Sequence, residues 1–504
     1  MPGEQQNSQQ HNQKQRIFQP DPTGRRLSRQ TLLRTSAAMS AWKFFIITFG
    51  CKVNQYESQS LREAWQKLGG VECDAPGQAD VLCVNSCAIT ARGERDARNA
   101  VFRLRREAPA ARLILTGCAA QLFANFRPRP GAIWAEPDLL VPQEAKSSLL
   151  RGPWSGKSLP ALPPETAFPP FEIRAFRRAR PVLKVQDGCA HRCTYCIVPL
   201  TRGKPRSRAP QEILEEARRL LRAGYAELML SGVNLRQYGR DVPGYGDFWS
   251  LLHFLDENLA PEFEGRARLR ISSLEPSQLA GRGLTTLTDC RLLCPHLHIS
   301  LQHASPAVLK RMGRGHYTAA MLEEAVAALA TRWPRMGLGA DILVGFPGET
   351  DKDLRLLLEL IERLPLSYAH VFPYSRRPGT AADSFTGHLP QAVKLGRAAL
   401  AREAVARRHQ RFLLDQLDLP HMLVAPDTLK RLPSETKRAA AENATVHGSG
   451  AWRKGVNEFY APCLFRFPAA DGASQADRPT GLLPARPVRV TEKGLLVELK
   501  TTEA

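Results

Sequence analysis

The stretch DGCAHRCTYCIVPLTRGKPRSR, residues 187–208, places three cysteines within eight positions directly after the apolar run PVLKVQ. Cys189, Cys193 and Cys196, here called the loop triad, are separated by three and then two residues, and no fourth cysteine follows nearby. Three thiolates on one loop can bind three irons of a [4Fe–4S] cube and leave the fourth iron open to another ligand. Structural zinc sites favour paired C-x2-C units and four closed ligands. The spacing therefore favours a cluster, with a zinc site as the alternative.

The composition describes a large and basic protein. A chain of 504 residues is too long for one hydrophobic core and suggests about three or four domains. The net charge of +21 favours a polyanionic partner such as nucleic acid, although scattered arginines can also form a solvated surface. Eleven cysteines without a secretory leader fit a reducing compartment. No apolar run approaches the ~18 residues of a membrane span. We therefore expect a cytoplasmic protein without a membrane anchor.

The first third of the chain combines a polar extension with a strand–helix alternation. Residues 1–40 show almost no apolar periodicity and are expected to be disordered. Within residues 41–150, three runs have the apolar character of buried strands: KFFIIT (43–48), DVLCVNS (80–86) and RLILTG (112–117). Helical patterns separate them, so we expect an open parallel α/β domain.

A cysteine follows each of these three runs: Cys51, Cys87 and Cys118, here called the strand-end triad. The carboxyl ends of parallel strands share one edge, where ligands bind, so these cysteines should converge. The alternative is a small buried hydrophobe, which is the usual fate of a free cysteine and the one we expect for Cys73 and Cys83. The repeated placement nevertheless predicts a second set of metal ligands.

The remaining chain divides into a linker, a barrel and a small β domain. Residues 151–180 are rich in proline and arginine and read as a linker. Residues 181–420 alternate six strand-like runs with helices, which predicts a partial (βα)6 barrel of the TIM type with its site at the carboxyl ends of the strands. Residues 421–504 have the short strands and turns of a small β-barrel. The fold class is therefore α/β. Residues at the strand ends should face one cavity: Gly232, Asn234, Ser273, Glu275, Gln302 and Gly345.

Several stretches in the same order resemble the radical SAM methylthiotransferases. They are TFGCKVNQYES, NSCAIT, TGCAAQ, the stretch containing the loop triad, and HVFPYSRRPGT. The resemblance covers residues 43–420, and the final barrel is weakly similar to a TRAM domain, a small RNA-binding fold. Four motifs are most similar in sequence to the branch of the family that methylthiolates C2 of N6-threonylcarbamoyladenosine at position 37 of tRNA: GCKVNQYES, SGVNLRQYG, RISSLEP and HLHISLQ. Related branches act on N6-isopentenyladenosine-37 or on a ribosomal-protein aspartate and remain alternatives. A non-enzymatic zinc RNA-binding protein is a remote one.

The resemblance implies two [4Fe–4S] clusters and S-adenosylmethionine (SAM). The first cluster binds SAM and cleaves it to a 5′-deoxyadenosyl radical, and its ligands are Cys189, Cys193 and Cys196. The second is an auxiliary cluster that carries or donates sulfur, and its ligands are Cys51, Cys87 and Cys118. One SAM supplies the methyl group and another supplies the radical that activates C2 of the adenine.

The same resemblance implies the residues that hold SAM. They are Tyr195 at the adenine, Gly232 and Asn234 at the methionyl end, Ser273 and Glu275 on the ribose or carboxylate side, and Gln302. For Tyr195 the alternative is packing beside the cluster, and for the polar residues it is a hydrogen bond at the barrel rim.

The substrate side is expected to be basic. Four cationic residues follow the loop triad and could neutralise phosphates of the anticodon stem-loop, although a solvated face is the alternative: Arg202, Lys204, Arg206 and Arg208. The implied partners besides tRNA are an electron donor such as flavodoxin or ferredoxin and a sulfur donor, and we expect a monomer. No motif singles out the lysine or arginine that the threonylcarbamoyl carboxylate would require.

Overall fold

The computed structural model describes most of the chain, namely residues 41–126, 137–154, 168–427, 451–467 and 481–500. The expected disordered extension, residues 1–40, lies outside these ranges. None of the helices described is long and apolar enough to cross a membrane.

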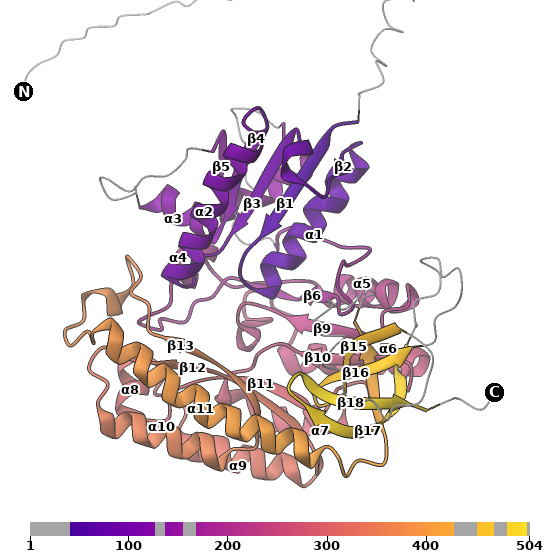
Figure 1. Ribbon diagram of the computed structural model, residues 1–504, viewed down its shortest axis with the longest axis vertical. Helices are drawn as coiled ribbons and strands as arrows, with labels where there is room; N and C mark the ends of the chain where they lie inside the picture. The colour runs from indigo at the N-terminus through magenta and orange to yellow at the C-terminus, as the bar shows by residue number, and fades with distance from the viewer. Residues whose placement is uncertain (1–40, 127–136, 155–167, 428–450, 468–480, 501–504) are drawn as a thin grey trace, which may run out of the picture. The chain divides into compact units, whose positions relative to one another are not determined.

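Five parallel strands form the N-terminal sheet, coloured indigo to purple in Figure 1, in the order β2-β1-β3-β4-β5. The strands are β1 (Lys43–Thr48), β2 (Val71–Glu72), β3 (Val81–Ser86), β4 (Arg112–Gly117) and β5 (Leu139–Pro142). The helical segments are α1 (Lys52–Lys67), η1 (Pro76–Gln78), α2 (Ala91–Glu107), α3 (Cys118–Asn125) and η2 (Gln143–Arg151). Strand β3 is buried along its whole length, as an inner strand of a parallel sheet should be. The predicted open parallel α/β arrangement is confirmed.

Six further parallel strands form the predicted partial barrel as two three-stranded sheets, β10-β9-β6 and β11-β12-β13. An isolated parallel bridge between Leu274 and Ile299 connects the two sheets. The strands are β6 (Val182–Lys184), β9 (Glu227–Ser231), β10 (Arg268–Ile271), β11 (His296–Gln302), β12 (Gly337–Val344) and β13 (Leu366–Pro373). One strand therefore comes from each of the six predicted units.

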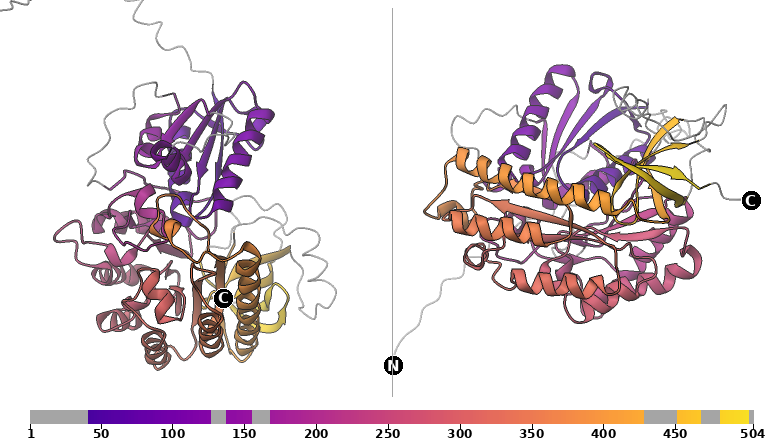
Figure 2. Two further views of the ribbon diagram at one scale, coloured as in Figure 1. Left: turned by 90° about the vertical axis from the view of Figure 1, so that its left-hand side faces the viewer. Right: turned by 60° about the horizontal axis from the view of Figure 1, so that its bottom comes forward.

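Helices follow the barrel strands in the expected alternation. The main ones are α5 (Pro210–Arg222), α6 (Phe248–Phe263), α7 (Arg282–Asp289), α9 (Ala319–Ala330), α10 (Asp351–Arg363) and α11 (Gln391–Asp415). Short segments between them are α4 (Val198–Arg202), η3 (Leu235–Gln237), η4 (Pro276–Gln278), α8 (Pro306–Arg311) and η5 (Ala381–Ser384). Figure 2 shows α11 running along the outside of the β11–β13 sheet, against β13.

The loop that carries three cysteines is closed at its base by a two-residue antiparallel ladder. Strand β7 (Gln186–Asp187) pairs with β8 (Arg206–Ser207). Between them, Gly188 has φ +71°, and a Cβ there would lie 1.9 Å from the carbonyl oxygen of Lys204. Only glycine fits here without strain, because the backbone of residue 188 passes directly against the backbone of Lys204.

A closed five-stranded barrel forms the C-terminal end, drawn in yellow in Figure 1, in the order β14-β15-β16-β18-β17. Its strands are β14 (Met422–Pro426), β15 (Ala451–Val456), β16 (Pro462–Phe467), β17 (Leu483–Thr491) and β18 (Gly494–Leu499). This is the small β-barrel predicted from the alternation of short strands and turns.

Two arginines of β10 attach this barrel to the six-stranded region. Arg268 and Arg270 each approach Glu227 to 2.7 Å, and all three side chains are buried. Arg268 also donates to the carbonyls of Leu423 and Val456, at 2.7 and 3.0 Å. Burial opposes ionisation of Glu227, but the two guanidinium groups outweigh it and hold its pKa well below the usual range. The contact is therefore an ion pair with backbone carbonyls as additional acceptors.

We predict that Arg270→Ala weakens the attachment of the C-terminal barrel. Removing one partner of a buried ion pair costs about 3–5 kcal/mol because the other charge stays buried and uncompensated. Thermal unfolding and limited proteolysis should show a lower transition temperature and faster cleavage in the barrel. Arg222→Ala, which breaks an exposed pair with Glu262 at 2.8 Å, is the matched control and should change little. Equal effects of the two substitutions would contradict this account.

Candidate active site

The strand-end triad converges at the carboxyl edge of the N-terminal sheet. Cys51 comes three residues after β1, Cys87 directly follows β3, and Cys118 is the first residue of α3 directly after β4. A Cβ placed on Gly50 would lie 2.7 Å from both Cβ and Sγ of Cys87. Burial raises the pKa of Cys87 to about 11, and the charges of Cys118 and Cys51 act on it as well. Three residues far apart in sequence thus lie together, with Cys51 exposed and the other two buried.

Side-chain hydrogen bonds tie the three strand ends to one another. The Asn54 Nδ2 amide donates to the carbonyls of Phe49 and Ser86, at 3.0 and 2.9 Å. The Ser86 hydroxyl donates to the carbonyl of Thr116 at 2.5 Å. The edge that carries the strand-end triad is therefore braced across β1, β3 and β4.

The loop triad opens into a cavity at the carboxyl ends of the barrel strands. The other polar or aromatic residues that line it are His191, Tyr195, Asn234, Ser273, Glu275, Ser300 and Arg314. Tyr195, Asn234, Ser273 and Glu275, which the sequence proposes as SAM contacts, thus share one cavity with the three cysteines.

Hydrogen bonds surround two of the loop cysteines. The Sγ of Cys189 accepts from the backbone N–H of His191 at 3.4 Å, from Gln237 at 3.6 Å and from Asn234 at 3.7 Å. Burial raises its pKa. For Cys193, hydrogen bonds from His191 and Arg314 outweigh burial and lower the pKa. Since thiolates are the metal-binding form, these donors suit a ligand set that carries negative charge.

Glu275 is the principal anionic group of the cavity. Its carboxylate lies 3.1 Å from Asn234 Nδ2, from His191 Nδ1 and from His316 Nε2, and 3.3 Å from Arg236 Nη1. Burial opposes ionisation, but His191 and the nearby cations outweigh it and lower the pKa of Glu275 to about 2. The carboxylate is ionised near neutral pH and can accept a hydrogen bond from an ammonium or hydroxyl group.

Two other proposed SAM contacts have different surroundings and are not among the residues that line the cavity. A Cβ on Gly232 would lie 2.9 Å from Leu235 and 3.0 Å from Gln186, so this glycine is required for close packing. The Gln302 Oε1 accepts a hydrogen bond from the Tyr195 hydroxyl at 3.1 Å. Gln302 thus orients a cavity residue.

The structure adds three residues that sequence reasoning missed: His191, Gln237 and Arg314. His191 lies in CAHRC, where only the cysteines were predicted as site residues. Gln237 lies in NLRQ, where only the asparagine was predicted. Arg314 lies 3.6 Å from the Sγ of Cys193 and donates to the carbonyl of Ser300 at 3.2 Å, but it follows α8 and no strand. No strand-end signal could have pointed to it.

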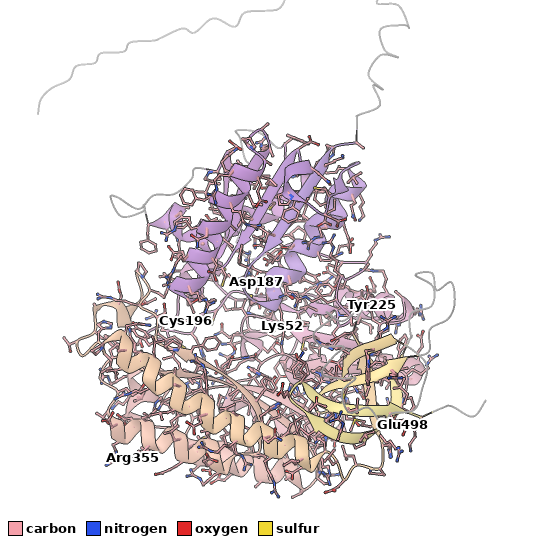
Figure 3. All side chains as sticks on the ribbon, in the orientation of Figure 1. Lys52, Asp187, Cys196, Tyr225, Arg355 and Glu498 are labelled. Carbon is pink, nitrogen blue, oxygen red and sulfur yellow. The ribbon has the colours of Figure 1, made fainter. Side chains whose placement is uncertain are left out.

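A buried set of ions, here called the Glu57 network, connects the two cysteine triads. Glu57 lies in α1, six residues after Cys51, and its carboxylate contacts Lys146 at 2.6 Å, Lys184 at 2.7 Å and Arg202 at 3.0 Å. Asp187, which begins the cysteine loop, contacts Lys184 at 2.7 Å and Arg202 at 2.9 Å. Figure 3 labels Asp187 where the N-terminal sheet meets the barrel strands.

The burial of two of the four basic residues corrects the expectation that all four bind RNA. Arg202 is buried against Glu57 and Asp187, and Arg208 is buried against Glu216 at 3.1 Å. Neither side chain can reach a phosphate. Lys204 is exposed and Arg206 is partly exposed, so phosphate contact stays a prediction for these two alone.

We predict that Gly50→Ala disrupts the strand-end triad selectively. Gly50 has φ +88°, which strains any residue with a Cβ, and the new methyl group would collide with Cys87. After anaerobic iron–sulfur reconstitution, the variant should bind about half the iron of the parent, a ratio that assumes one cluster at each triad. Gly69→Ala, at a glycine with φ +82° and nothing within 4 Å of the new Cβ, is the matched control. Full iron content in Gly50→Ala would contradict the convergence.

We also predict a pH-dependent penalty for Arg202→Met. Burial opposes ionisation of Glu57, but Arg202 and the two lysines outweigh it and hold the pKa of that carboxyl well below its usual range. A carboxyl with a depressed folded pKa stabilises the protein above its unfolded pKa, about 4, and loses that contribution as the pH falls through the folded pKa.

Arg202→Met should therefore cost about 3–5 kcal/mol near pH 7, because two buried carboxylates lose their shared partner. The difference from the parent should narrow as the pH falls below about 4, where Glu57 and Asp187 take up protons in the unfolded chain before they do so in the folded parent. Thermal unfolding of the cluster-free protein across pH measures this difference. A difference independent of pH would show that Arg202 stabilises the protein by packing alone.

Comparisons with known proteins agree with this site. Residues 183–361 match the model of the radical SAM superfamily, and residues 43–126 match the uncharacterized protein family UPF0004. The two matches contain the loop triad and the strand-end triad, respectively.

Among characterised relatives, the threonylcarbamoyladenosine tRNA methylthiotransferase MtaB of Aquifex aeolicus is 33% identical over 373 residues, covering 72% of this chain and 88% of the relative. The tRNA-2-methylthio-N(6)-dimethylallyladenosine synthase of Bartonella quintana is 32% identical over 391 residues, covering 74% of this chain and 84% of the relative. Among solved structures, the radical SAM methyltransferase TsrM from Kitasatospora setae aligns with a TM-score of 0.44 at 15% identity, covering 66% of this chain and 76% of that chain. With its cysteine triads at the two matched regions, the chain belongs to the radical SAM methylthiotransferase family.

Proposed function

We propose that this protein methylthiolates C2 of N6-threonylcarbamoyladenosine at position 37 of tRNA. The observation that carries the proposal is the pair of cysteine triads joined by the Glu57 network. A single triad would serve many radical reactions, whereas a second one beside it supplies a place from which sulfur can be delivered.

The choice of acceptor rests on sequence. Five relatives described as threonylcarbamoyladenosine tRNA methylthiotransferases are 33 to 35% identical to this chain. Three described as dimethylallyladenosine synthases are 32 to 33% identical. The percentage of sequence identity separates the two branches weakly. The motif GCKVNQYES at residues 50–58 favours the threonylcarbamoyl branch.

The donor sets suit two iron–sulfur clusters. Each triad offers three thiol groups, and cations lie beside both: the charges of Cys118 and Cys51 act on Arg202, and Arg314 donates to Cys193. Such cations offset the negative charge that thiolates and iron–sulfur clusters carry. Clusters bound there would supply the electron that cleaves SAM and the sulfur that enters the product.

The protein's own residues bind and orient the reactants. Ionised Glu275, together with Asn234 and Ser273, offers acceptors and a donor for the polar groups of SAM. Tyr195, fixed by Gln302, provides a flat surface for its adenine. Outside this cavity, exposed Lys204 is available to an RNA phosphate, in keeping with a chain of net charge +21, whereas Arg206 is only partly exposed and lies 3.8 Å from Asp187.

The test is nucleoside analysis of tRNA from a bacterium that lacks its own tRNA methylthiotransferases and expresses this chain. We predict that mass spectrometry detects 2-methylthio-N6-threonylcarbamoyladenosine. The product should be absent with Cys193→Ala and with Cys87→Ala, while Cys463→Ala, which removes a buried thiol of the C-terminal barrel, should keep it. Formation of the 2-methylthio derivative of isopentenyladenosine alone would overturn the acceptor and leave the family assignment intact.

A further inference from the structure

Lys52 differs from four other cations of the chain, each of which forms an ion pair. Lys146 and Lys184 contact carboxylates at 2.6 and 2.7 Å, and Arg270 contacts Glu227 at 2.7 Å. Arg180 contacts Asp427 at 2.8 Å. Lys52, by contrast, makes no ion pair with any residue that the structure describes, and its Nζ lies 3.8 Å from the thioether sulfur of Met229. A thioether is a weak acceptor, so this ammonium group lacks a counter-charge.

Asp341 is the carboxylate whose charge acts most strongly on Lys52, and it contacts a histidine. The charge of Asp341 acts on Lys52 from beyond ion-pair distance. The Oδ1 of Asp341 lies 3.2 Å from His298 Nε2 on the neighbouring strand β11. Asp341 thus lies in contact with His298 and beyond ion-pair distance of Lys52.

The helix that carries Lys52 does not account for a lysine there. Lys52 is the first residue of α1, whose first turn contains no acidic residue. The amino end of a helix carries partial positive charge and disfavours a cation. The described part of the chain thus offers Lys52 no ion-pair partner, and the helix end disfavours its charge. An anion from outside the chain would supply the partner.

Lys52 lies next to the strand-end triad. It follows Cys51 directly, and its side chain reaches Met229 of β9, the strand that leads into the Asn234 end of the SAM cavity. Figure 3 labels Lys52 where the N-terminal domain meets the barrel strands. A base that receives sulfur from the strand-end triad must approach Cys51, so a group attached to that base comes close to Lys52, the next residue in the chain.

We propose that Lys52 binds the carboxylate of the threonylcarbamoyl group and selects this nucleoside over its isopentenyl counterpart. The inference rests on the proposed function, because it assigns the recognition residue of the same site. The side chain of threonylcarbamoyladenosine carries a carboxylate, and an isopentenyl group has neither charge nor an acceptor. Binding the apolar group would leave the ammonium of Lys52 desolvated and unpaired, a penalty that the charged substrate removes.

The test uses anticodon stem-loop RNAs that differ only at position 37: threonylcarbamoyladenosine, its methyl ester, and isopentenyladenosine. They are assayed with the reconstituted parent protein and with Lys52→Gln, Lys52→Arg and Lys67→Gln. Lys67 is exposed at the other end of α1 and serves as the matched control. The readouts are RNA affinity by fluorescence anisotropy, KM and kcat for methylthiolation, SAM cleavage without RNA, and iron content.

For Lys52→Gln we expect the KM and Kd for the threonylcarbamoyl RNA to rise by about 10- to 100-fold, the range expected for loss of one charge-assisted hydrogen bond. SAM cleavage and iron content should match the parent. Lys52→Arg should restore most of the affinity, and Lys67→Gln should behave as the parent. Esterification should weaken binding to the parent by a similar factor and have little further effect on Lys52→Gln.

The outcomes separate this inference from the proposed function. Unchanged affinity in Lys52→Gln, or an equal ester effect in both proteins, overturns the role of Lys52 while the function stands. Loss of iron in Lys52→Gln with unchanged RNA affinity also overturns it, because the lysine would then serve the cluster. A parent protein that modifies only the isopentenyl RNA overturns the proposed acceptor itself.

Discussion

The carboxylate of Glu57 is the point on which the arrangement of the site depends. It contacts three cations from three segments: Lys146 of η2, Lys184 of β6 and Arg202 of α4. Burying four charges is costly unless every one has a partner, so the segments must be in place together. Because α1 begins beside Cys51 and α4 ends the loop that carries the other triad, satisfying these charges fixes the two triads relative to each other.

The sequence was informative wherever one local pattern determined the structure. Short apolar runs that alternate with amphipathic stretches predicted the parallel strands of the N-terminal sheet and of the partial barrel, because strands buried on both faces need continuous apolar sequence. The convergence of Cys51, Cys87 and Cys118 followed from topology, since parallel strands end at a common edge. The same reasoning placed Asn234 and Glu275 in the cavity of the loop triad. Helix α1 begins at Lys52, and its first turns bury polar residues, which an apolar pattern does not reveal.

Sequence reasoning failed where long-range pairing decided the outcome. Arg202 and Arg208 belong to a run of basic residues that locally resembles a solvated or RNA-binding surface. The carboxylate that engages Arg202, that of Glu57, is 145 residues away in the chain. Arg314 approaches Cys193 across 121 residues and follows no strand. In the same way, the sequence could not single out Lys52, because only the described three-dimensional surroundings show that it makes no ion pair there.

The proposed insertion of sulfur requires that the protein hold two metal clusters close together. The most direct measurement is electron paramagnetic resonance of the reduced, reconstituted protein, compared with variants that each retain one triad. If the triads face a common space, the parent spectrum should show spin–spin coupling and differ from the sum of the two single-cluster spectra. A parent spectrum equal to that sum would mean that the clusters are far apart, and it would contradict the delivery of sulfur from one site to a base activated at the other.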